Sequence, residues 1–195
     1  DLPRLTYQHL VLVFVSLAAA CAVGIPLGIA AAGSRALAQP VLATTGLIQT
    51  IPSLALLAFL IPITGAIGTL PALIALFLYS LLPIVRATHS ALTGIARSQR
   101  EAAIALGMRQ MQRLRLVELP LATRGILSGV KTSAVINVGT ATIAAFIGAG
   151  GYGERITAGL ALNDHAMLLA GAIPAAALAL VVHGTFELVD RWLAR

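Results

Sequence analysis

The feature that most constrains this chain is a run of fifty residues, Ala36 to Val85, without a single Asp, Glu, Lys or Arg. As one α-helix the run would be about 75 Å long, whereas the hydrocarbon core of a bilayer is about 30 Å thick. It must therefore turn, and residues 64–71, with two glycines, two threonines and a proline, favour a turn there. The run predicts two membrane-spanning helices joined by a short connection.

The composition extends this interpretation to the whole chain. Of 195 residues, 58% are hydrophobic and 10% are charged, against about 45–50% and about 25% in an ordinary soluble domain. So few charges disfavour a soluble enzyme, a disordered chain and a cytosolic nucleic-acid-binding protein. The single cysteine, Cys21, excludes an internal disulfide and a cysteine metal site. We therefore expect a membrane protein.

Charge-free runs divide the chain into five predicted spans, and backbone polar groups in lipid require them to be helices. We expect one all-α transmembrane domain over residues 1–195, with residues 93–124 forming a cytoplasmic segment. The spans are residues 10–33, 41–63, 70–92, 126–148 and 167–189.

The basic residues set the orientation, because Lys and Arg collect on the cytoplasmic side. With the N-terminus outside and the C-terminus inside, ten of the thirteen basic residues are cytoplasmic. The ten are Arg35, Arg86, Arg97, Arg100, Arg109, Arg113, Arg115, Arg124, Arg191 and Arg195. The positive net charge is thereby explained by topology, without a nucleic-acid partner.

The cytoplasmic segment has the pattern of a helical hairpin. Ser98 and Glu101 have the spacing of a capping box, and Gly107 suits a helix C-terminus. A second short helix is predicted to follow, with Met111, Leu114 and Val117 on one stripe, and to end at Leu119-Pro120. Its basic, partly apolar face suits docking to another protein; the alternative is a hairpin resting on anionic lipid.

The segment contains Glu101-Ala102-Ala103, Gly107 four positions later, Val117 ten positions after that, and then Leu119-Pro120 after one more residue. This spacing resembles the cytoplasmic EAA signature of ABC-importer permeases, with Val117 where the family usually has Ile. The resemblance implies a short helix that fits a groove of the ATP-binding subunit and transmits its closure. It assigns coupling to the ATPase to Glu101, Ala102, Ala103, Gly107, Arg109, Leu119 and Pro120. The alternative is that Glu101 only caps a helix and Gly107 only ends one.

Three further segments, residues 49–56, 80–86 and 138–151, are similar to the osmoprotectant branch of that family, which imports glycine betaine, choline or carnitine. The similarity extends from about Leu5 to Leu193. It implies the five-transmembrane-helix type I ABC-importer permease fold in the bacterial cytoplasmic membrane. The alternatives are an amino-acid permease of the methionine type and, more remotely, a stand-alone channel or membrane scaffold.

The absence of a G-x-x-x-x-G-K-[S/T] phosphate loop predicts that ATP and Mg bind to a separate ATPase subunit, not to this chain. The four histidines are scattered without the spacing of metal ligands, so we expect no catalytic residue, no metal and no cofactor here. Residues 148–153 match G-x-G-x-x-G but follow a membrane helix instead of a strand. We interpret them as a flexible extracellular turn or gate.

The resemblance also implies partners. Two copies of the ATPase and a second permease chain, either identical or a related paralogue, are expected. Aromatic residues that could cage a quaternary ammonium ion are few, with one Trp, three Tyr and five Phe. We therefore expect specificity to reside mainly in an extracytoplasmic solute-binding protein.

Polar side chains inside apolar spans are candidates for a solute path. Asn137 is the first choice, although a hydrogen bond between helices, worth about 0.6 kcal/mol on average, explains it equally well. We expect Lys131 to extend to the cytoplasmic interface, with a path role as the alternative. The candidates are Gln49, Ser53, Tyr79, Ser133, Asn137, Thr140 and Thr142.

Small-residue pairs mark places where helices can approach closely. Gly24 and Gly28 have this spacing in the first span, and Gly125 and Gly129 have it at the start of the fourth. We expect these four positions to serve helix packing.

Overall fold

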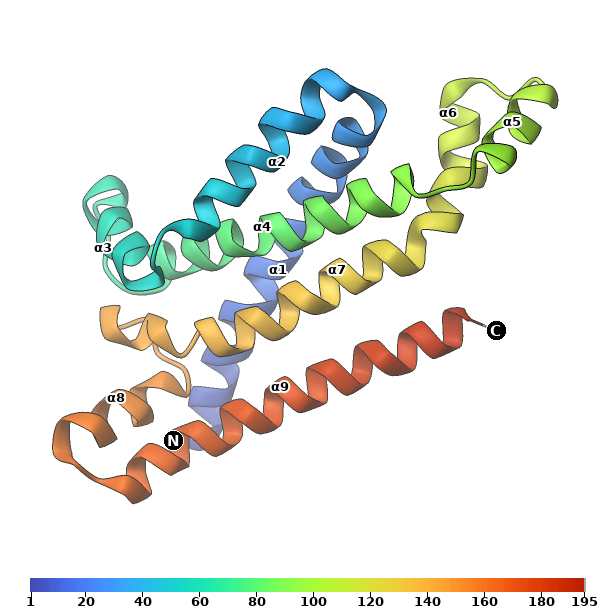
Figure 1. Ribbon diagram of the computed structural model, residues 1–195. Helices are drawn as coiled ribbons and strands as arrows, with labels where there is room; N and C mark the ends of the chain where they lie inside the picture. Colours follow the sequence, from blue (N-terminus) through green and yellow to red (C-terminus); the bar gives the residue numbers. More distant parts are fainter. Residues whose placement is uncertain (195) are drawn as a thin grey trace.

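The computed structural model describes residues 1–194, in which every regular element is a helix (Figure 1). Arg195, one of the basic residues assigned to the cytoplasm, lies outside the described residues. In chain order the elements are α1 (Leu2–Gly33), α2 (Arg35–Thr50), α3 (Ser53–Thr64), α4 (Thr69–Thr93), α5 (Arg97–Ala105), α6 (Gln110–Arg113), the π-helix η1 (Leu114–Glu118), α7 (Leu119–Thr140), the 3₁₀-helix η2 (Ile143–Ile147), α8 (Gly153–Leu162) and α9 (His165–Leu193).

The core lies where α4 packs between α1 and α7, and Figure 1 shows α1 crossing both of these helices. Two of the predicted glycine contacts are found here. A Cβ added at Gly28 would fall 2.5 Å from the Cβ of Thr88, and one added at Gly129 would fall 2.3 Å from the Cβ of Ala87. The close approach expected from the small-residue spacing is therefore confirmed.

The segment 41–63, expected to be one helical span, is broken. α2 and α3 meet at 101° across Ile51 and Pro52. Ile51 has φ −70° and ψ 125°, the extended conformation that the ring of a following proline imposes. The position of Pro52 in the middle of the apolar run therefore breaks the helix, although hydropathy alone favours continuity.

The cytoplasmic hairpin also differs from its prediction. Ser98 lies inside α5, whose N-cap is Ala96, and Glu101 pairs with Arg97 at 2.7 Å, so no capping box forms. Pro120 does not end a helix either. The π-turn of η1, in which the Leu119 N–H bonds to the Leu114 carbonyl, leads directly into α7, where a proline in the first turn is tolerated.

Apolarity and length make α1, α4 and α9 able to cross a bilayer, and the bent pair α2 and α3 supplies a fourth candidate. α7, which contains Arg124 and Lys131, does not meet the same measure. It ends at Thr140, eight residues before the end of the predicted span 126–148, and a turn and η2 follow. The five crossings and their orientation stay predictions.

Candidate functional site

The first candidate site is the surface of α5 and α6 at the far end of the molecule from the N-terminus (Figure 1). Exposed apolar side chains gather here among basic residues: Ile104 is 56% exposed, Leu106 77% and Met111 55%. Of the seven residues assigned to coupling, five are exposed, namely Glu101, Ala102, Gly107, Arg109 and Pro120. An exposed apolar patch of this kind is typical of a surface that contacts another protein or a membrane.

The other two assigned residues are not exposed on this surface. Ala103 is 3% exposed and packs beneath α5, whereas Leu119 is half-buried at the start of α7. Ala103 therefore anchors α5 and does not face a partner.

Gly107 ends α5 as predicted. Its φ of 74° is left-handed, and the Met108 N–H reaches back to the Ala103 carbonyl at 3.2 Å, as in a Schellman motif. A Cβ at Gly107 would meet no atom within 4 Å, so its backbone conformation, not its surroundings, requires glycine.

The second candidate site is a hollow at the break between α2 and α3. Four of the seven predicted path residues line it, together with Thr50, Ile51, Pro52 and Ile136; the four are Gln49, Ser53, Tyr79 and Thr140. They come from α2, α3, α4 and α7, so the fold gathers side chains separated by up to 91 residues in the sequence.

Two prolines explain the polar contacts of this hollow. Pro83 has no N–H, so the Tyr79 carbonyl lacks its partner within α4, and the Gln49 Nε2 donates to it at 2.8 Å. In the other direction, the Tyr79 hydroxyl donates to the carbonyl of Ile51 at the break before Pro52. Gln49 and Tyr79 thus satisfy backbone carbonyls that have no partner in lipid.

The remaining path candidates lie elsewhere. Asn137 and Ser133 are fully buried: the Asn137 Nδ2 donates to Ser16 Oγ at 3.0 Å, and the Ser133 hydroxyl donates to the Ser80 carbonyl at 2.9 Å. These are contacts between helices, which is the alternative stated for Asn137. Thr142 donates to the carbonyl of Gly139 in its own turn.

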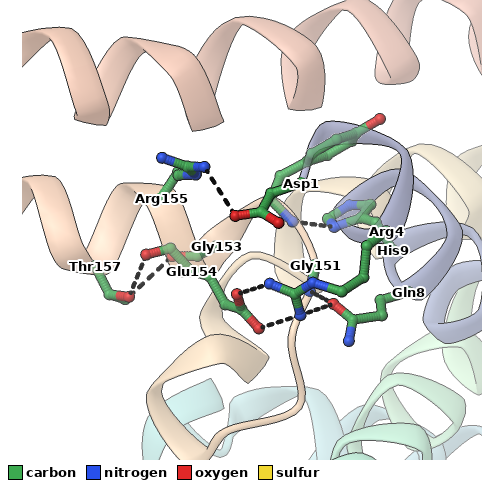
Figure 2. Close-up of polar contacts among 10 residues, drawn as sticks. Asp1, Arg4, Gln8, His9, Gly151, Gly153, Glu154, Arg155 and Thr157 are labelled. Atoms are coloured by element: carbon green, nitrogen blue, oxygen red, sulfur yellow. Dashed lines mark hydrogen bonds and ion pairs between the residues drawn. The ribbon is translucent and has the colours of Figure 1, made fainter.

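The glycine-rich loop 148–153 is held by α1 (Figure 2). The Gly151 N–H donates to Gln8 Oε1 at 3.2 Å, and the buried His9 ring packs on Tyr152 with ring centroids 4.7 Å apart. Arg4 pairs with Glu154 at 2.9 Å. These contacts argue against the flexible turn that we expected. No local pattern could predict them, because the partners are more than 140 residues apart in the sequence.

Lys131 does not extend alone to the interface. Its ammonium group pairs with Glu187 of α9, and Arg124 pairs with Asp190 at 2.9 Å on the same two helices. The two ion pairs join α7 to α9. Within residues 1–194, no three His, Cys, Asp or Glu side chains form a group that could hold a metal ion.

Comparison with known proteins agrees with this arrangement. Residues 24–195 match the family model described as binding-protein-dependent transport system inner membrane component. The osmoprotectant import permease protein OsmW of Salmonella typhimurium is 46% identical over 185 residues, which are 93% of this chain and 86% of that protein. The glycine betaine/carnitine/choline transport system permease protein OpuCD of Bacillus subtilis is 44% identical over 190 residues, 97% of this chain and 81% of that protein.

Among solved structures, the MetNI methionine ABC transporter in an inward-facing conformation has the same fold. One of its chains superposes with a TM-score of 0.91, covering 100% of this chain and 96% of that one, at 25% sequence identity. The type I permease fold expected from the sequence is thereby confirmed.

Proposed function

The chain belongs to the family of binding-protein-dependent transport system inner membrane components, and from that membership we propose that it is the permease subunit of an ATP-driven osmoprotectant importer. It is a multi-pass inner-membrane protein and a component of a transport system. The observation that carries the proposed cargo is the 46% identity to an osmoprotectant permease along 93% of the chain. Glycine betaine, choline and carnitine are the solutes to test.

In this proposal a separate ATPase docks on α5 and α6. The exposed Ile104, Leu106 and Met111 supply apolar contact, and the surrounding arginines supply charge. The carboxylate of Glu101 and the left-handed turn at Gly107 give the surface its shape. Closure of the ATPase would displace α5 and thereby the helices behind it.

The solute path passes the hollow at the break between α2 and α3. Discontinuous helices present backbone carbonyls at membrane depth, where a cation can approach them. Two such carbonyls, those of Tyr79 and Ile51, accept hydrogen bonds from the side chains of Gln49 and Tyr79 respectively. Ser53 and Thr140 add hydroxyl groups to the lining of the hollow. The hollow opens on the molecular surface, so a second permease chain would complete the path.

Reconstitution tests the proposal. The chain is purified with the subunits that accompany it and placed in liposomes with the solute-binding protein encoded beside it. Uptake of radiolabelled glycine betaine, choline, carnitine and methionine is then measured with ATP. ATP-dependent uptake of any of the first three is expected; uptake of methionine alone would reverse the choice of cargo, and purification without any ATPase would favour a channel or scaffold.

Variants of α5 test the docking surface. Glu101→Lys and Gly107→Asp are expected to insert normally but to lose uptake. Arg97→Gln is the matched control, because it breaks the same exposed Arg97–Glu101 pair and keeps Glu101. Such a pair contributes about 0–1 kcal/mol, so its loss alone has little effect. Normal uptake by both test variants would overturn the assignment of α5 to coupling.

Methionine is the second candidate, favoured by the superposition on a methionine transporter. The matching chain of that transporter is 25% identical in sequence to this chain, whereas the osmoprotectant relatives named above are 44–46% identical. Since a shared fold serves many cargoes, the sequence identity ranks the osmoprotectants first.

A further inference from the structure

Three charged side chains meet where α5 joins the rest of the molecule. Arg113 Nε donates to Glu118 Oε1 at 3.0 Å, and Arg100 Nε lies 3.4 Å from the same oxygen. The Glu118 side chain is only 12% exposed, compared with 35% for Arg100 and 23% for Arg113. We refer to these residues as the Glu118 cluster.

The cluster joins four elements. Arg100 belongs to α5, Arg113 is the last residue of α6, and Glu118 is the last residue of η1, directly before α7. The guanidinium of Arg100 also donates to the carbonyl of Leu92, in the last turn of α4. One arginine of α5 is therefore tied to α4 on one side and to the start of α7 on the other.

The last turn of α1 completes the surroundings of the cluster. Ile29, Ala30, Ala32 and Gly33 line the same hollow as Leu92 and the three charged residues. The hollow thus lies beneath α5, where the ends of α1 and α4 meet α6 and η1, directly before α7.

Little else fastens α5. The helix lies wholly within the described residues, and Ala103 is its one buried side chain. The connections on both sides, residues 94–96 and 106–109, are short and each contains a glycine. Without a firm attachment, a displacement of α5 would bend these connections and would not move the membrane helices. The ion pair of Arg100 with Glu118 provides such an attachment, and the charge-assisted hydrogen bond from Arg113 holds the same carboxylate in place.

We propose that Glu118 is a positioning residue for transport: through Arg100, which also binds the last turn of α4, it locks α5 to the start of α7, so that a displacement of α5 moves both helices together. The inference rests on the proposed docking of an ATPase at α5. Glu118 itself touches neither the ATPase nor the solute in this scheme, and it acts through Arg100 and Arg113.

The first test measures the lock directly and needs no transported solute. In a Cys21→Ala background, spin labels are placed at the exposed Gln99 of α5 and Thr132 of α7 of the purified complex. The label-to-label distance is expected to be narrowly distributed in the parent and broad in Glu118→Gln. Asp190→Asn, which breaks the exposed Arg124–Asp190 pair between α7 and α9, is the control and keeps the narrow distribution. A narrow distribution in Glu118→Gln would refute the lock.

The second test measures coupling in proteoliposomes, as solute taken up per ATP hydrolysed, with radiolabelled glycine betaine and choline. Glu118→Gln is expected to lower this ratio by about fivefold or more, while Glu118→Asp keeps most of it. A misfolded fraction lowers uptake and hydrolysis alike and leaves the ratio unchanged, so an unchanged ratio overturns the proposal. If the parent transports neither solute, the proposed cargo fails, and the spin-label distances still decide the lock.

Discussion

The contact of Gly129 with α4 allows a quantitative test of how tightly the core is packed. A Cβ at this position would lie 2.3 Å from the Cβ of Ala87 and 2.8 Å from the carbonyl oxygen of Pro83. Neither atom is the end of a flexible side chain, so Gly129→Ala forces α7 away from α4. We expect this overpacking to cost about 1–3 kcal/mol.

Gly139→Ala is the matched control in the same helix, because a Cβ there meets nothing within 4 Å. Replacing a helical glycine by alanine stabilises by up to about 1 kcal/mol, and both variants share this gain. Gly129→Ala is therefore expected to be about 1–3 kcal/mol less stable than Gly139→Ala. For a chain of this size, that is a difference in Tm of roughly 2–12 °C.

The assay is thermal unfolding of the purified protein in mild detergent, with the fraction of protein that stays monodisperse as the readout. Adding Ala87→Gly to Gly129→Ala removes the closer contact and leaves the one with Pro83, so partial recovery is expected. If Gly129→Ala is as stable as Gly139→Ala, or if Ala87→Gly gives no recovery, the close approach of α4 and α7 is wrong.

Three further outcomes are expected in the same unfolding assay. Asp164→Ala should lose about 1 kcal/mol, because the carboxylate caps α9 by accepting from the N–H groups of Ala166 and Met167 at 2.9 and 3.0 Å; Asp164→Asn should keep most of the stability. Lys131→Met should be less stable than the double variant Lys131→Met/Glu187→Met, since the single change leaves a carboxylate without its cation; equal stability would contradict the ion pair. Tyr79→Phe should lose about 1–3 kcal/mol by leaving the Ile51 carbonyl unpaired, whereas Tyr7→Phe, at a tyrosine that is 71% exposed, should have no effect.

Local patterns accounted for the bounds of α4 and for the exposed surface of α5. α4 begins and ends within one residue of the predicted span 70–92, because Gly68 precedes it and Gly94 follows it. The EAA spacing identified the exposed surface of α5, since that spacing is contained within twenty residues of the chain. The assignments of individual residues to coupling and to the solute path stay predictions for the variants above.

Local patterns misjudged the start of α5 and the loop 148–153. Ser98 and Glu101 have the spacing of a capping box, yet Ala96 caps α5 and Glu101 pairs with Arg97. The loop 148–153 was expected to be flexible, yet Gln8 and His9, 143 residues away in the sequence, bind it. The expectation that Lys131 extends to the interface stays a prediction.

Hydropathy and motif spacing were enough to predict the membrane class, the helical fold and the family, because they act over about twenty residues and do not depend on what lies across the molecule. The partners of the buried polar groups depend on how the helices pack, which no local pattern encodes. The Tyr79 carbonyl, freed by Pro83, is met by Gln49 across 30 residues, and the Asn137 side chain is met by Ser16 across 121. Lipid offers buried polar groups no hydrogen bonds, so such groups bond to whichever helix the fold brings beside them.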